Sequence, residues 1–224
     1  MGESNKRTPP DPAVLVPGVN SCYGNGWRQL LKYFLELFLI SIIAFIIGLP
    51  SGMGRWAEGV PYVGAILGFL GFAYGILIVG PVDYGVAFAH LKAARADKLQ
   101  VPEDMFEAFQ GYWNAVLANL LVFSIVAIGL VLLIVPGIIF ACKLAFTPYL
   151  VVERKMEVIE AVKESWRMTN GYAWKVFLIG LLAIPISIAG LICFGVGIIV
   201  AIMWIRLTFA SLYHSVTLLK HPSN

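Results

Sequence analysis

The sequence predicts an all-α membrane protein, a polytopic bundle of six transmembrane helices in three hairpins with two amphipathic helices at the cytoplasmic interface. The first observation is composition: of the 224 residues, 59% are hydrophobic and 13% are charged. A soluble domain has roughly 25% charged residues, so this chain has too little polar surface to cover a water-soluble fold. The second observation is that the apolar residues gather into runs that approach the about 20 residues needed to cross a bilayer.

Six such runs are present, at 30–49, 60–89, 113–135, 137–152, 173–193 and 195–217. The first, third and fifth connections between them are rich in Gly and Pro, whereas the second and fourth are longer and charged. This alternation predicts three successive hairpins, and a loose similarity between "FEAFQGYW" and "IEAVKESW" suggests that they arose by internal duplication. We expect a single six-helix domain over 25–219, preceded by a disordered or extended Pro-rich tail over 1–24 and followed by a short tail over 220–224.

The distribution of basic residues predicts the orientation in the membrane. Arg55 is the one basic residue outside the helix interiors that falls on the side opposite the termini. Under the positive-inside rule, this bias places both termini in the cytoplasm. The basic residues on the side of the termini are Lys6, Arg7, Arg28, Lys32, Lys92, Arg95, Lys98, Arg154, Lys155, Lys163, Arg167, Lys175 and Lys220.

Both charged connections carry apolar side chains at helical spacing. In the second connection these include Phe106, Phe109 and Trp113, and in the fourth they include Trp166. Such a pattern is typical of amphipathic helices that lie in the membrane interface. The same pattern also fits helices that pack on the ends of the bundle and touch little lipid.

Three charged residues fall well inside the predicted spans: Lys143, Arg206 and Asp83. Lys143 lies about 9 Å from the turn at Pro136 at 1.5 Å per residue, so its side chain can reach the outer face by snorkelling. Arg206 is deeper, and an Arg at the centre of a span costs about 2.5–3.5 kcal/mol unless it is paired or faces water. Because Asp83 is the one carboxylate well inside a span, the sequence predicts an Asp83–Arg206 pair inside the bundle. Such a pair would fix helix register or mark a path or headgroup site.

The second predicted span carries a glycine at every helical turn. Gly64, Gly68, Gly71 and Gly75 lie on one face of a helix, within about 60° of one another at 100° per residue. A face of small residues lets another helix approach closely. We expect the approaching helix to belong to this chain or to a second subunit.

The chemistry-bearing residues are scattered. His90, His214 and His221 have no spacing typical of paired ligands, and Cys22, Cys142 and Cys193 match neither a zinc motif nor a disulfide framework. No nucleophile elbow, phosphate-binding loop or HExxH motif is present. The sequence therefore predicts a protein that is not an enzyme and needs no cofactor or metal.

The segment from Pro148 through Glu153 to "EAVKESW", followed by an aromatic start to the next span, resembles a family of bacterial six-helix membrane proteins. That family includes the membrane domain fused to glycerophosphodiester phosphodiesterases. The resemblance covers roughly residues 20–217 and implies the bacterial cytoplasmic (inner) membrane as the location. The chain lacks the soluble phosphodiesterase domain and its metal ligands, so the resemblance transfers no hydrolase activity and no functional residue.

These observations predict an accessory, scaffold or lipid-interacting subunit of the cytoplasmic membrane. The alternative is a small-solute or ion transporter or channel that uses Arg206, Lys143 and Asp83. Expected partners are membrane lipids, including anionic headgroups, and other membrane-protein subunits. Nucleic acid is excluded because the basic residues gather at the membrane edges.

Overall fold

The computed structural model describes residues 16–52, 61–192 and 196–220, and every element within these ranges is helical. Six helical segments are long and apolar enough to cross a membrane, and each overlaps one predicted run. The all-α, six-span prediction is therefore confirmed. The grouping into three hairpins stays a prediction, because residues 53–60 and 193–195, at two of the three expected turns, lie outside the described residues. The segments are Phe34–Gly52, Tyr62–Ala94, Glu103–Leu132, Ile134–Glu153, Ala173–Ile192 and Gly197–Lys220.

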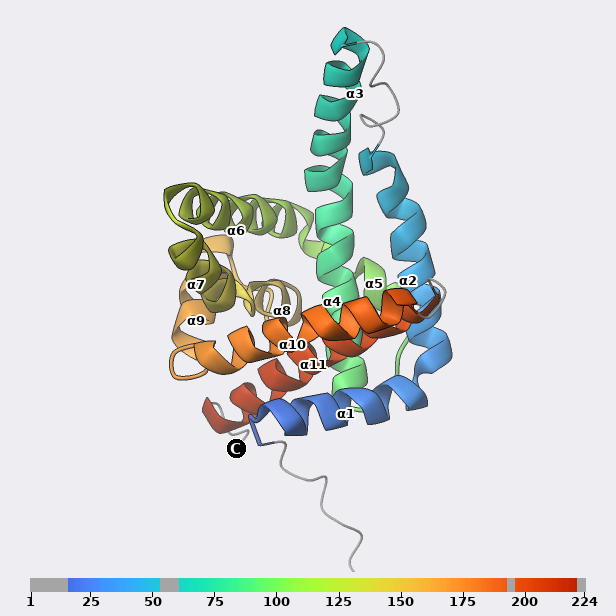
Figure 1. The fold of residues 1–224 in the computed structure, drawn as a ribbon, viewed down its shortest axis with the longest axis vertical. Coiled ribbons are helices and arrows are strands. Elements are labelled where there is room, and N and C mark those ends of the chain that lie inside the picture. Colours follow the sequence, from blue (N-terminus) through green and yellow to red (C-terminus); the bar gives the residue numbers. More distant parts are fainter. Residues whose placement is uncertain (1–15, 53–60, 193–195, 221–224) are drawn as a thin grey trace, which may run out of the picture.

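The chain enters the fold through α1 (Val19–Lys32), which lies along α11 (Val196–Lys220) and across the foot of α4 (Figure 1). The predicted tail is wrong for residues 19–24, which are helical; residues 1–15 lie outside the described residues. Tertiary contacts hold this helix: the buried Asn25 amide donates to the Ala94 carbonyl at 3.1 Å and to Ser211 Oγ at 3.0 Å. A Cβ added to Gly26 would lie 3.0 Å from Thr208 Oγ1, so the glycine permits the close approach of α1 to α11.

The second span is one long helical column made of α3 (Pro61–Tyr74), a π-helical turn over Gly75–Val79 and α4 (Gly80–Ala94). Pro81 explains the π turn, because proline has no N–H to donate to the carbonyl four residues earlier. That carbonyl belongs to Leu77, and the Tyr112 hydroxyl donates to it instead at 3.0 Å. Beside the column runs α2 (Phe34–Gly48), which is tied to α3 by a 2.9 Å hydrogen bond from the Tyr74 hydroxyl to the Ile47 carbonyl (Figure 1).

The third and fourth spans are not continuous α-helices. After α4 come α5 (Glu103–Phe106) and a 3-10 turn over Glu107–Gly111, which lead into α6 (Tyr112–Leu132). The fourth span then breaks between α7 (Ile134–Leu144) and α8 (Thr147–Glu153), just before Pro148. Ser165 on α9 (Val158–Met168) stabilises this break, since its hydroxyl accepts from Phe146 N–H and donates to the Lys143 carbonyl.

The last two spans are α10 (Ala173–Ile192) and α11, which pack on each other and run across α4 at a steep angle (Figure 1). The spans are therefore not a set of parallel rods. The buried core lies where α1, α4, α8 and α11 meet, and it contains Leu30, Leu91, Phe146, Leu150 and Tyr213.

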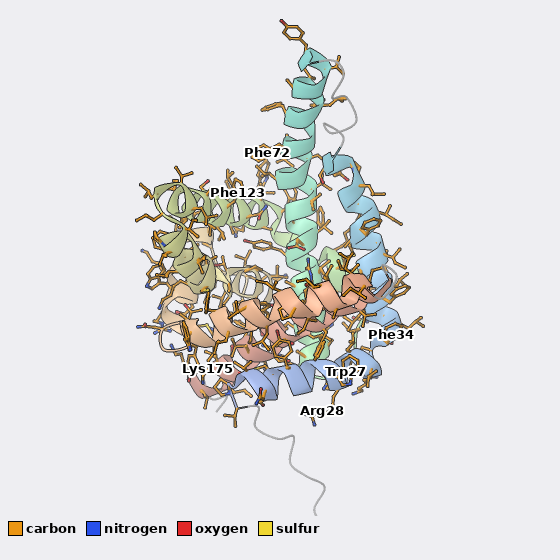
Figure 2. All side chains as sticks on the ribbon, in the orientation of Figure 1. Trp27, Arg28, Phe34, Phe72, Phe123 and Lys175 are labelled. Carbon is orange, nitrogen blue, oxygen red and sulfur yellow. The ribbon has the colours of Figure 1, made fainter. Side chains whose placement is uncertain are left out.

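Large apolar side chains cover much of the outer surface, as Figure 2 shows for Phe72 on α3 and Phe123 on α6. These two rings are about half exposed, with their centroids 6.2 Å apart. Exposed apolar surface of this extent is typical of helices that face lipid.

On the predicted glycine face, Gly71 packs closely against another part of the chain, whereas among the described residues Gly68 and Gly75 do not. A Cβ on Gly71 would lie 2.6 Å from the carbonyl oxygen of Ser51, whereas a Cβ on Gly68 or Gly75 would meet no described atom within 4 Å. Gly64 is half-buried. Within the chain, the turn after α2 therefore meets the glycine face at Gly71. Packing of the whole face, against this chain or a second subunit, stays a prediction.

Candidate functional site

The strongest candidate site is the ion pair between Asp83 on α4 and Arg206 on α11. Arg206 Nη2 donates to Asp83 Oδ1 at 2.6 Å. The predicted partnership is therefore confirmed, but its setting differs from a sealed bundle interior. The side chain of Arg206 is 36% exposed and that of Asp83 is 57% exposed within the protein, so the pair lies in an opening at the protein surface.

Packing on either side fixes both residues of the pair. On α11, Met203, Leu207 and Ala210 are fully buried against the core, which places Arg206 at the border of the buried face. On α4, Val82 and Tyr84 are buried on both sides of Asp83 in the chain. The two helix backbones are thus held by apolar contacts, and the charged side chains meet at the edge of the contact between α4 and α11.

A cavity of about 610 Å³ opens at this pair, between α2, the π turn, α4 and α11. We call it the lateral groove. Its polar lining residues are Asp83, Arg206 and Ser41, and the Ser41 hydroxyl already donates to the Leu37 carbonyl at 2.8 Å. The remaining walls are apolar: Ile42, Ala44, Phe45, Val79, Val82, Val86, Ile198, Ile199 and Ile202. A ligand in the groove would meet one cation and one anion side by side in an apolar surround.

Much of the hydrogen-bonding capacity of the pair is unused. A guanidinium has five N–H donors, and a carboxylate has about four acceptor positions. Among the described residues, Arg206 donates one hydrogen bond, to Asp83, and Asp83 accepts one, from Arg206. Free donors and free acceptors are therefore both available at the groove.

Below the pair, His90 lies two turns along α4 from Asp83 and is fully buried. Its Nδ1 lies 2.7 Å from the Val86 carbonyl, while its Nε2 has no hydrogen-bond partner among the described residues. The ring does not line the groove. A buried imidazole with one donated bond to a carbonyl is the ordinary neutral form, so we place His90 in the supporting core.

A second polar cluster, for which the sequence offered no pattern, joins the C-terminal ends of α4 and α8 to α11. Arg95 forms an ion pair with Glu153, and Arg95 Nε donates to His214 Nδ1 at 3.2 Å. The Tyr213 hydroxyl donates to Glu153 Oε2 at 2.6 Å. Arg95, Glu153 and the Tyr213–His214 pair come from three distant parts of the sequence, so the periodicity of any one segment could not predict this cluster. Its charged groups are paired within the fold, so the cluster has a structural role in holding α4, α8 and α11 together.

Lys143 does not belong to the lateral groove. Its Nζ donates to Asn170 Oδ1 at 3.3 Å and lies 5.5 Å from the centroid of the Trp166 ring. Both partners belong to the fourth connection, on the side of the termini. The expectation that Lys143 snorkels to the opposite, outer face is therefore wrong. The break between α7 and α8, held by α9, brings the lysine to the connection.

The predicted interfacial aromatics lie at two places on the surface. Phe106, Phe109, Tyr112 and Trp113 form a chain of ring contacts around the 3-10 turn. Trp166 packs near Phe140 on α7. Phe106, Trp113 and Trp166 are exposed, whereas Phe109 is half-buried. Their location at a membrane interface stays a prediction.

Within the described ranges, no group of three or more His, Cys, Asp or Glu residues is placed to hold a metal ion. Comparison of the chain with protein-family models, with curated proteins and with solved structures finds no match. The resemblance to the six-helix bacterial family therefore stays a prediction, and the lateral groove is the feature from which a function can be argued.

Proposed function

We propose that this chain is a non-enzymatic integral membrane protein that holds a membrane lipid in the lateral groove, as an accessory or scaffold subunit of the bacterial cytoplasmic membrane with both termini inside. The observation that carries the proposal is the composition of the groove: nine of its twelve lining residues are apolar, and the other three include the Asp83–Arg206 pair. A lipid combines acyl chains with a charged headgroup, and this groove offers contacts to both.

The apolar walls favour a lipid over a dissolved solute. Sites for small polar solutes and ions place polar groups and broken helices around the ligand. Here Ile42, Phe45, Ile199 and Ile202 form apolar walls. An acyl chain from the bilayer is as apolar as these walls, so it packs against them without placing a polar group on an apolar surface.

The alternative of a small-solute or ion transporter rests on Arg206 and Asp83 alone. Lys143, the third residue expected on such a path, bonds to Asn170 and lies over Trp166 instead of lining the groove. The groove therefore holds two of the three charges expected on a transport path, and transport is less well supported than lipid binding.

Filling the groove with protein tests the proposal. Ile202 lines the groove and is 44% exposed, whereas Ile188 on α10 is 56% exposed and lies outside it. We expect Ile202→Trp to purify in mild detergent with less bound phospholipid than the parent, measured as phosphate per mole of protein. Ile188→Trp is the matched control and should retain the parental amount. Equal retention by the parent and both variants would place the bound lipid elsewhere and contradict the proposal.

A further inference from the structure

The charges at the lateral groove also select the headgroup. Resting on the proposed lipid-binding function, we infer that the bound lipid is a zwitterionic phospholipid whose headgroup carries a primary ammonium, with Arg206 binding the phosphate and Asp83 binding the ammonium. The inference rests on the arrangement of these two residues. Arg206 and Asp83 are both partly exposed, lie 2.6 Å apart and line the same groove.

Arg206 has the chemistry of a phosphate ligand. A guanidinium presents a planar fork of donors that matches two phosphate oxygens, and such charge-assisted bonds are about twice as strong as neutral ones. Among the described residues, its Nε and Nη1 donate to no protein acceptor. These donors can bind a phosphate while Nη2 keeps its bond to Asp83.

Asp83 determines what else the headgroup must carry. Its side chain is 57% exposed, and its Oδ2 accepts no hydrogen bond from a described residue. A purely anionic headgroup at Arg206 would bring like charges together at this carboxylate, which is unfavourable in an apolar surround. A headgroup with a cation beside its phosphate would instead pair with both side chains and leave the groove electrically neutral.

The groove also distinguishes primary from quaternary ammonium. A quaternary ammonium has no N–H to donate and is usually recognised by a cage of aromatic rings. Phe45 is the single aromatic residue among those that line the groove. The carboxylate of Asp83 accepts N–H donors, so the site fits a primary ammonium such as that of ethanolamine.

The test is a competition in mixed micelles that contain equal amounts of phosphatidylethanolamine, phosphatidylglycerol and phosphatidylcholine, with retained lipid counted by native mass spectrometry. The full-length parent should retain phosphatidylethanolamine over each of the other two by about tenfold, the size expected from one charged hydrogen bond. Asp83→Asn should lose this preference and shift toward phosphatidylglycerol, because it removes the negative charge that opposes an anionic headgroup. Asp97→Asn, an exposed aspartate outside the groove, is the matched control and should keep the parental preference.

The outcomes separate this inference from the proposed function. A parent that retains phosphatidylglycerol or phosphatidylcholine as well as phosphatidylethanolamine overturns the headgroup inference and leaves lipid binding standing. A parent that retains none of the three overturns both. The comparison within the parent needs no variant, so it decides the inference even if Asp83→Asn fails to fold. In that case Asp83→Glu, which keeps the carboxylate, should keep the preference for phosphatidylethanolamine; loss of the preference would also overturn the inference.

Discussion

Arg206 and Asp83 are 123 residues apart in the chain, and their side chains meet at 2.6 Å across α11 and α4. Both are partly exposed at the lateral groove. Removing one partner of a fully buried pair costs about 3–5 kcal/mol, because the remaining charge has no partner. Here the cost should be smaller, since the remaining side chain is partly exposed and can bond to other groups. A variant of this pair can therefore lose lipid binding while the protein stays folded.

We expect Asp83→Asn to lower the free energy of unfolding by about 1–2 kcal/mol, less than for a sealed pair. The double variant Asp83→Leu with Arg206→Met should recover much of this loss, since no charge then faces the apolar walls. Thermal melts followed by far-ultraviolet circular dichroism in one detergent would measure both. A double variant that is less stable than Asp83→Asn would show that the pair stabilises the fold by itself.

Gly85 marks the closest approach between α4 and α5. A Cβ at this position would overlap the carbonyl oxygen of Met105, which is backbone and cannot rotate away. Gly85→Ala should therefore separate the two helices and sharply reduce the folded yield. The matched control is Gly75→Ala, whose Cβ meets no described atom within 4 Å. Equal monodisperse yields of both variants by size-exclusion chromatography would contradict the packing described for Gly85.

The glycine column gives a second matched pair. Gly71→Leu must displace the Ser51 carbonyl from 2.6 Å, whereas Gly68→Leu points into space that is free of described atoms. We predict a lower melting temperature for Gly71→Leu and a near-parental one for Gly68→Leu. If Gly68→Leu instead reduces the melting temperature or dissociates an oligomer, a second subunit covers that face.

Burial raises the pKa of the Cys22 thiol on α1 to about 11, against about 8.5 for an unfolded chain. The folded state therefore keeps this proton between about pH 8.5 and 11 while the unfolded state releases it, so stability falls as pH rises through this window, by about 1.4 kcal/mol per pH unit. Cys22→Ala lacks this contribution. The difference in unfolding free energy between parent and variant should be constant below about pH 8.5 and shift against the parent above it. A constant difference up to pH 11 would mean that Cys22 is not buried as described.

Thiol accessibility tests the orientation. Asp97, Lys163 and Ser51 are exposed in the structure, so a cysteine at each should not disturb packing. In a background without native cysteines, Asp97→Cys and Lys163→Cys should resist an impermeant maleimide in intact cells and react after lysis. Ser51→Cys should react in intact cells. Labelling of position 97 or 163 from outside would reverse the proposed topology.

The sequence by itself determined the class, the six spans and the partner of Arg206. Span positions depend on local runs of apolar residues, because each spanning helix satisfies its own backbone hydrogen bonds. The pair was predictable by elimination, since Asp83 is the one carboxylate well inside a span. The bias of basic residues toward one side is likewise a local property of the chain, and the orientation inferred from it stays a prediction.

Only the tertiary structure decided which groups the glycines and Lys143 contact and where the lateral groove forms. Gly71 and Gly68 carry the same signal in sequence, yet one contacts the turn after α2 and the other does not. Lys143 lies in the last turn of α7, just before a helix break that Ser165 stabilises from 22 residues away, and so it reaches Asn170 instead of the outer face. The lateral groove exists because α2, α4 and α11 meet at an angle, and such a geometry depends on contacts between distant segments that no local pattern encodes.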